Sequence, residues 1–224
     1  MKKRKPDAIK HVLIAPALIL FVAITIFPLV FNIVMSLCNW KLGGNIQFVG
    51  LANYISAFQN GTFWRTMLNT VVITVVSVAV GFVLGVALGI VLSRFPRAAR
   101  FILPALSVLN TVPGIVFIGL LFLWLGMRPV TVLAALSIYA AFPVLKNTVA
   151  GLAAVEPQYK EAARGCGMDQ LQRLRLVELP LAMPTIIGGL RLSTVYTVSW
   201  AVLAAMIGQG GLGDFIYKGV SSNN

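Results

Sequence analysis

Apolar residues occur in five long runs along the chain, and each run is long enough to cross a lipid bilayer as a helix. The hydrocarbon layer is about 30 Å thick, so a spanning helix needs roughly 20 apolar residues. The runs of that length cover residues 12–38, 66–93, 101–127, 129–151 and 181–207. Only Lys146 and Arg191 place a charge within them. The pattern predicts an all-α integral membrane protein with about five transmembrane helices.

The composition favours a bilayer over an aqueous solvent. Of the 224 residues, 58% are hydrophobic and 11% are charged, and the mean hydropathy is +0.90. A soluble core of this size could not bury so much apolar surface. The first run continues for more than twenty residues, whereas the hydrophobic region of a signal peptide has about 7–15, so we expect residues 12–38 to stay as an anchor.

Lysine and arginine are unevenly distributed among the segments that join the runs. If the N-terminus lies inside, the thirteen inner residues are Lys2, Lys3, Arg4, Lys5, Lys10, Arg94, Arg97, Arg100, Lys146, Lys160, Arg164, Arg173 and Arg175. The four outer residues are Lys41, Arg65, Arg128 and Lys218. Because Lys and Arg are retained on the cytoplasmic side, this asymmetry predicts a multi-pass protein of the cell inner membrane with a cytoplasmic N-terminus. The net charge of +12 then reflects topology and anionic lipid rather than a nucleic-acid interface.

The sequence offers no arrangement typical of catalysis or of metal binding. Cys38 and Cys166 are predicted on opposite sides of the membrane, and His11 has no partner residues, so we expect no disulfide, metal site or cofactor. The letters of residues 208–213 match a dinucleotide motif but follow a membrane helix, and we interpret them as an outer turn. No phosphate-binding loop occurs, so any use of ATP requires a partner. All six acids lie outside the apolar runs, which argues against proton-coupled transport and most membrane enzymes.

Two features inside the runs suggest roles within the membrane. Gly81, Gly85 and Gly89 recur every four residues, a spacing typical of closely packed helices. Arg191 lies about ten residues into the last run, where two interpretations remain open. It either lines a pathway or extends its side chain to the inner headgroups.

Charge is concentrated in the longest inner loop, over residues 152–179. Pro157 suits the first position of a helix, and Gly165 and Gly167 suit its end. Asp169 can cap a second helix, with Gln172 completing a capping box. We therefore predict two short helices that meet at a bend, and the pattern alone fits either a docking face or a loop that merely closes the interface.

The second of these short helices has an apolar strip at helical spacing. Leu171, Leu174 and Val177 form the strip. The charged residues Asp169, Arg173 and Glu178 are expected to point elsewhere, and Pro180 is expected to start the next element.

The same loop carries a recognisable motif. Glu161-Ala162-Ala163, then Gly167, then Val177-Glu178-Leu179-Pro180 resemble the EAA loop of permease subunits of ATP-binding-cassette importers, written EAA-x3-G-x9-I-x-LP, with Val177 in place of Ile. In that family the loop is the coupling helix that seats in a cleft of the ATPase subunit. The ATPase-docking residues that the resemblance implies are Glu161, Ala162, Ala163, Arg164, Gly167, Asp169, Leu179 and Pro180.

Two subfamilies resemble different parts of the chain. From about residue 110 to residue 220, the stretches NTVPGI, FPVLKNTVAGL, VELPLAMP, GLRLSTVY and AAMIGQGGLGDFIYKG are similar to permeases for glycine betaine, carnitine and choline. Residues 12–70, with APALILF and FVGLANYISAF, resemble sugar permeases of the maltose and glycerol-phosphate type. The longer resemblance implies import of a compatible solute, and a sugar or glycerol-phosphate importer is the alternative.

The family resemblance also implies an organisation and partners. We expect a basic cytoplasmic segment over 1–11, a transmembrane permease domain over 12–208 with its coupling loop at 152–179, and an external Gly-rich turn and tail over 209–224. The implied partners are a cytoplasmic ABC ATPase subunit, a second permease subunit in a homo- or heterodimer, and an external solute-binding protein. Because such permeases normally continue into one more helix, a truncated, non-transporting membrane subunit is a further alternative.

Aromatic residues in the fourth and fifth runs are candidates for the solute pathway. Quaternary ammonium groups bind over aromatic faces. Tyr139, Tyr196 and Trp200 are therefore candidate pathway residues together with Arg191. The alternative is that these aromatic side chains only pack between helices or anchor them at the interface.

Overall fold

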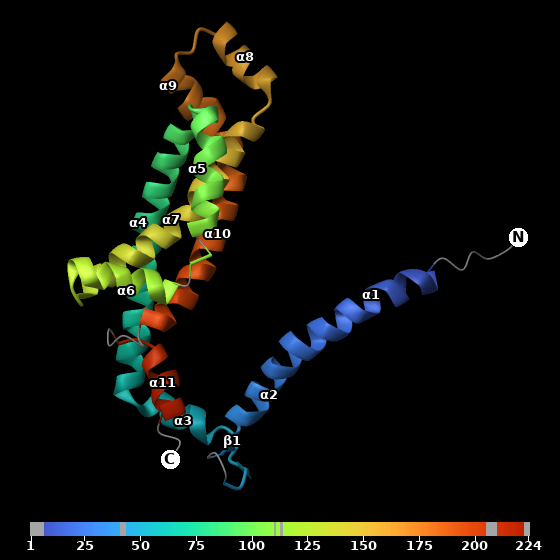
Figure 1. Cartoon of the computed structure of the whole chain (residues 1–224), viewed down its shortest axis with the longest axis vertical. Coiled ribbons are helices and arrows are strands. Elements are labelled where there is room, and N and C mark those ends of the chain that lie inside the picture. Colours follow the sequence, from blue (N-terminus) through green and yellow to red (C-terminus); the bar gives the residue numbers. More distant parts are fainter. Residues whose placement is uncertain (1–6, 41–43, 110, 113, 205–209, 222–224) are drawn as a thin grey trace, which may run out of the picture. The chain divides into compact units, whose positions relative to one another are not determined.

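The computed structural model describes residues 7–40, 44–109, 111–112, 114–204 and 210–221 (Figure 1). The basic residues 2–5, Lys41 and the start of the predicted Gly-rich turn at 208–209 lie outside this part of the chain. The chain divides into two compact units, one made of residues 1–63 with 221–224 and the other of residues 64–220.

The first unit contains a long apolar helix. It is built from three elements that follow one another without a break, namely α1 (Asp7–Phe21), the π-helical turn η1 (Val22–Ile26) and α2 (Phe27–Ser36). Together they provide a candidate membrane span of 27 residues, Lys10–Ser36. None of the described residues in its most apolar window is buried, as expected for a helix that contacts lipid.

A small polar network ties the end of this helix to the segment that follows. The segment consists of the antiparallel strands β1 (Cys38–Asn39) and β2 (Gln47–Phe48) and the helix α3 (Ala52–Gln59). The Asn53 amide donates to the carbonyl oxygens of Ser36 and Cys38 at 2.9 and 3.0 Å. The Tyr54 hydroxyl lies 2.6 Å from the Ser36 hydroxyl, so α3 is held against the end of α2.

The second unit is organised around one central helix. Its long helices are α4 (Gly61–Ser93), α7 (Pro129–Ala154) and α10 (Leu179–Ala204). Within the most apolar window of α7, 67% of the residues are buried, against 22% for α4. Figure 1 shows α4 and α10 lying along α7, which accounts for the burial of α7.

Close approach between α4 and α7 depends on three glycines. Gly81, Gly85 and Gly89 face successive turns of α7 in the same order along both helices, so the helices run parallel. A Cβ atom built on Gly85 would lie 2.7 Å from the carbonyl oxygen of Ala141. The corresponding atoms on Gly81 and Gly89 would lie 2.5 and 2.6 Å from side chains of α7. No residue with a side chain fits these positions without separating the helices.

Helix α10 packs antiparallel to α7. The Ser193 hydroxyl donates to the carbonyl oxygen of Ala140 at 2.8 Å, and Gly189 lies against Pro143. At the other end of the pair, Gly151 of α7 lies against Ala182. Interhelical hydrogen bonds and small residues of this kind are typical of helix pairs in membranes.

The third predicted span is wrong as a single helix. In its place the structure has two shorter helices, α5 (Pro96–Leu109) and α6 (Gly114–Leu125), so four helices in the described residues are long enough to cross a membrane. Pro113 disfavours a helical conformation in Val112, which lies in a bend between them. Because α4 and α7 run parallel, the chain between them must cross the membrane in the opposite direction. Helices α5 and α6 together make this crossing.

The last long helix begins earlier than predicted. The helix α9 (Gln170–Arg173), the π-helical turn η2 (Leu174–Glu178) and α10 are continuous, and they provide a span over Gln170–Val202. Pro180 therefore lies inside a helix rather than at its start. The Leu179 N–H donates to the Leu174 carbonyl, five residues back, in the wider π turn directly before the proline.

A short helix follows the Gly-rich turn. Gly210 and Gly211 have φ of 73° and 114°, which favours glycine at both positions. The Leu212 N–H donates to the Thr70 hydroxyl of α4 at 2.9 Å. Helix α11 (Gly213–Ser221) comes next, in a segment predicted from the sequence as a turn and tail.

Candidate functional site

The segment between α7 and α10 folds as two helical pieces joined by a tight bend. Helix α8 (Pro157–Gly165) starts with proline at its first position and ends where the Cys166 N–H donates to the Ala162 carbonyl at 3.0 Å. Gly167 has a φ of 76°, which an L side chain rarely adopts. The bend therefore depends on glycine at this position.

The second piece starts at the capping box predicted from the sequence. The Gln172 N–H donates to Asp169 Oδ1 at 2.8 Å, and the Asp169 N–H donates to Gln172 Oε1 at 3.0 Å. These two bonds satisfy donors at the start of α9 that have no partner within the helix. Together α8, the bend, α9 and η2 form what we name the α8–η2 segment, residues 157–178.

The residues singled out in this segment differ in their exposure. Glu161, Ala162, Arg164, Gly167 and Asp169 are exposed around the bend. Ala163 is buried beneath them, and Leu179 packs against the core cluster where α7 meets α10. Pro180 is exposed on α10. The structure therefore presents five of the eight residues on one projecting bend, and Ala163 and Leu179 support it from below.

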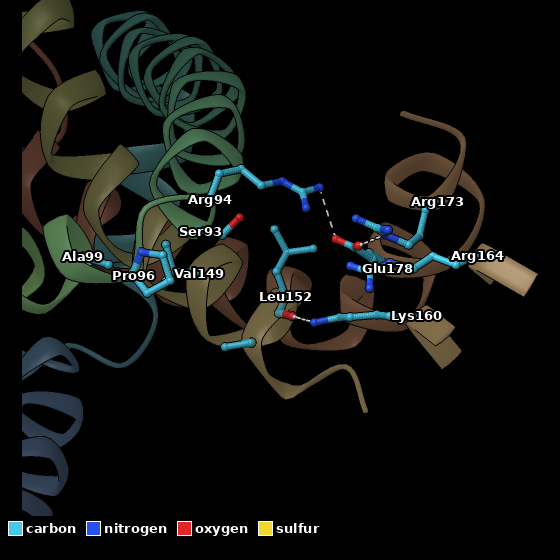
Figure 2. Close-up of a pocket in the computed structure, with 11 residues that line it drawn as sticks. Ser93, Arg94, Pro96, Ala99, Val149, Leu152, Lys160, Arg164, Arg173 and Glu178 are labelled. Atoms are coloured by element: carbon cyan, nitrogen blue, oxygen red, sulfur yellow. Dashed lines mark hydrogen bonds and ion pairs between the residues drawn. The ribbon is translucent and has the colours of Figure 1, made fainter. Parts of the chain in front are cut away.

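An ion triad that was not predicted from the sequence fixes the base of the segment. The Glu178 carboxylate accepts from Arg173 Nε at 2.8 Å and lies 3.2 Å from a guanidinium nitrogen of Arg94 (Figure 2). The side chains of Glu178 and Arg173 are only 5% and 10% exposed. Arg94 follows the last residue of α4, so the triad joins α4 to the α8–η2 segment.

Arg173 and Glu178, which were expected only to point elsewhere than the apolar strip, are therefore buried charged residues of this helix. In an α-helix, residues five apart lie about 140° apart around the axis. The π turn of η2 has i to i+5 bonding, which brings residues five apart onto one side. Leu171 of the predicted apolar strip is 53% exposed, so the charged pair lies further inside than the leucine. Arg173 and Glu178 stand shortly before a long apolar run in the sequence. This position was the signal that could have indicated their burial.

A cavity of about 480 Å³ adjoins the triad. Figure 2 shows it between the ends of α4 and α7 and the inner face of the α8–η2 segment. Its charged lining residues are Arg94, Lys160, Arg164, Arg173 and Glu178. Lys160 Nζ donates to the carbonyl oxygen of Leu152, near the end of α7, at 3.2 Å.

The candidate pathway residues do not form one cluster. The rings of Tyr139 and Trp200 stack with centroids 5.3 Å apart, and the Tyr139 hydroxyl donates to the Val112 carbonyl at 2.9 Å. Phe117 packs edge-on against Tyr139 with centroids 5.0 Å apart. Tyr196 and Arg191 are both exposed on α10. The structure thus brings Tyr139 and Trp200 together and leaves Tyr196 outside their contact.

No group of three His, Cys, Asp or Glu side chains that could hold a metal ion occurs in the described ranges. Cys38 and Cys166 are free thiols, and Cys166 is exposed at the bend of the α8–η2 segment.

The chain is similar to several characterised permease proteins. It is 41% identical over 131 residues to the carnitine transport permease protein OpuCB of Listeria monocytogenes, covering 58% of this chain and 60% of that protein. It is 39% identical over 131 residues to the choline transport system permease protein OpuBB of Bacillus subtilis (strain 168), with the same coverage of 58% and 60%. The chain thus spans about 60% of the length of these relatives.

The chain also matches a solved structure and a protein family. The MetNI methionine ABC transporter, in an inward-facing conformation, has a TM-score of 0.62 at 23% sequence identity, covering 73% of this chain and 82% of that chain. At this identity the likeness concerns the fold alone. Residues 81–224 match the family described as "Binding-protein-dependent transport system inner membrane component". Since this match covers more than half of the chain, the protein belongs to that family of binding-protein-dependent inner-membrane transport components.

Proposed function

We propose that this chain is the membrane-spanning permease subunit of an ATP-driven importer for a small compatible solute such as glycine betaine, carnitine or choline. The family of residues 81–224 and the names of the similar permeases support this function. The chain is a transport subunit rather than an enzyme, and a separate cytoplasmic ABC ATPase subunit hydrolyses ATP. An external solute-binding protein delivers the solute, and a second permease subunit completes the pathway.

The α8–η2 segment is the observation that carries this proposal. Its bend exposes Glu161, Ala162 and Gly167, with Arg164 and Asp169 beside them, on a surface that a soluble partner can reach. A docking surface must also be rigid if it is to transmit movement. The capping box holds the second helical piece in place, and the Arg94–Glu178–Arg173 triad holds the base of the segment against α4.

The connection from this segment into the membrane supports coupling by rigid movement. The chain is helical without a break from Gln170 to Val202, so a displacement at the bend is carried along α10. The triad carries the same displacement to the end of α4. ATPase closure would thus move two membrane helices together, as alternating access requires.

Arg191 supports a pathway along the exposed face of α10. A charged side chain within a membrane helix rarely faces lipid and usually faces a bundle interior or an aqueous cavity. Arg191 is exposed in this unit, so the face of α10 that carries it is available to a solute or to the second permease subunit. Tyr139 and Trp200 stack against each other, which supports a role in packing between α7 and α10.

A reconstituted complex tests the proposal. We expect the chain, assembled with a betaine-type ATPase subunit and its binding protein in lipid vesicles, to hydrolyse ATP faster when glycine betaine, carnitine or choline is added. Maltose and glycerol phosphate should leave the rate unchanged. Stimulation only by maltose or glycerol phosphate would favour a sugar-type importer, and capture of the ATPase without stimulation by any solute would favour a non-transporting subunit.

A double variant tests whether the bend holds the ATPase. Glu161→Arg with Gly167→Leu reverses a charge and places a side chain at a φ of 76°, so we expect the purified variant to lose the ATPase subunit. Arg128→Glu, a charge reversal at the opposite end of α7, is the matched control and should retain the subunit. If both variants capture it as well as the wild type, the bend is not the docking surface.

The two native cysteines test the orientation of the chain. Cys166 lies at the bend and Cys38 follows the first span, so the proposal places them on opposite sides of the membrane. In intact cells expressing Cys38→Ser, a membrane-impermeant maleimide should leave Cys166 unlabelled until the membrane is opened. With Cys166→Ser, the half-buried Cys38 should be labelled without opening the membrane. The reverse pattern would place the α8–η2 segment outside the cell and contradict the proposal.

A further inference from the structure

The cavity behind the α8–η2 segment has an unbalanced charge. Four cationic side chains and one carboxylate line it, a difference of three positive charges. Both oxygens of Glu178 are already engaged, one by Arg173 and the other by Arg94. Glu178 is therefore not available to neutralise Lys160 and Arg164, and no other acidic side chain of the described residues lines the cavity.

Lys160 and Arg164 are placed to share one ligand. They lie four residues apart on α8 and so on the same side of the helix. Figure 2 shows both side chains extending from α8 in the same direction, into the space bordered by Arg94. Lys160 bonds only a neutral carbonyl oxygen, and Arg164 has no ion-pair partner in the part of the chain that the structure describes. Their donors suit an anion with several acceptor oxygens.

The position of the cavity indicates which kind of anion it can bind. It opens where two candidate membrane spans end, at Ser93 of α4 and near Ala153 of α7, which is the level of the lipid headgroups. Its remaining wall includes the apolar side chains of Pro96, Ala99 and Val149. A cationic wall beside an apolar one suits a phosphate group attached to a less polar body.

We propose that this cavity is a binding site for a phosphate group, held by Lys160 and Arg164 with Arg94 at its edge. The phosphate comes either from an anionic phospholipid headgroup or from a soluble phosphate. This site does not depend on the proposed function, because the charges that form it are present whether or not an ATPase subunit docks on the bend.

Two probes distinguish the sources. Native mass spectrometry of the delipidated full chain in detergent measures saturable binding of phosphatidylglycerol, with zwitterionic phosphatidylcholine as the comparison. Thermal unfolding in inorganic phosphate, against sodium chloride of equal ionic strength, measures binding of the free anion. Saturable phosphatidylglycerol binding supports the lipid headgroup, and stabilisation by inorganic phosphate supports the soluble anion. If neither probe binds saturably, the inference is wrong.

A matched pair of double variants shows whether the cavity is the site. Lys160→Gln with Arg164→Gln should weaken binding of whichever probe binds the wild type by about tenfold or more, because charge-assisted hydrogen bonds are lost. Arg97→Gln with Arg175→Gln removes the same charge from exposed positions outside the cavity and should change binding by less than about twofold. Equal losses in both variants would overturn the site. Without a probe, the cavity variant should unfold at or above the wild-type temperature, which separates lost binding from misfolding.

Discussion

Replacing Glu178 with glutamine is expected to lower the free energy of unfolding by about 3–5 kcal/mol, because it leaves a buried arginine without its charge partner. The side chain of Arg173 is 10% exposed, so water cannot replace the carboxylate that it contacts at 2.8 Å. Arg94, at 37% exposure, is better solvated and should lose less. Chemical unfolding of the purified chain in detergent, followed by circular dichroism, measures the change.

Two further variants separate the ion triad from a general effect of charge. Glu161→Gln removes the same charge from the exposed bend and should change the unfolding free energy by less than about 0.5 kcal/mol. Replacing both Arg173 and Glu178 with methionine should recover much of the lost stability, because no buried charge is then left unpaired. A Glu178→Gln chain as stable as Glu161→Gln would show that the triad does not stabilise the fold.

The position of the membrane spans could be predicted from sequence because the bilayer sets one length for all of them. Hydropathy located the runs at 66–93, 129–151 and 181–207, each of which corresponds to a long helix. It did not locate the break in the run at 101–127, because no charged residue in that run marks where α5 ends and α6 begins. The broken connection follows from the parallel pairing of α4 with α7, a contact between segments distant in sequence.

The faces of these helices were harder to predict than their lengths. In a bilayer both lipid and protein neighbours select apolar side chains, so hydrophobicity does not show which side packs. Trp124 is 89% exposed and Leu136 is fully buried, although both lie in long apolar runs. Small residues gave the more useful signal, since Gly85 of the predicted glycine series lies directly against α7.

The candidate site was predictable where local geometry decides it. The capping box at Asp169 and the bend at Gly167 each depend on a few adjacent residues, and their sequence signals hold in the structure. The contact between Arg94 and Glu178 joins residues 84 positions apart. The pairing of Arg173 with Glu178 depends on a π turn that ordinary helical periodicity does not reveal. The EAA resemblance thus located the segment but not the triad that holds it.

Replacing Gly85 with alanine is expected to lower the unfolding free energy by about 1–3 kcal/mol, as overpacking does in a tightly packed core. The added Cβ would lie 2.7 Å from both the Ala141 carbonyl oxygen and the Val144 Cβ atom. Because one of these contacts is with the backbone, a change of rotamer cannot relieve it, and α4 must move away from α7. The effect should therefore fall near the upper end of that range.

Gly188 provides the matched control for this prediction. It also lies within a long membrane helix, α10, but a Cβ atom there would meet nothing within 4 Å. Gly188→Ala should leave stability unchanged or raise it by about 0.5–1 kcal/mol, since alanine favours the helix. Unfolding in detergent, with both variants measured side by side, separates the effect of replacing a glycine from the effect of disrupting the close contact between α4 and α7. If Gly85→Ala is as stable as Gly188→Ala, α4 and α7 do not meet at Gly85, and the parallel pairing that requires α5 and α6 to return across the membrane is wrong.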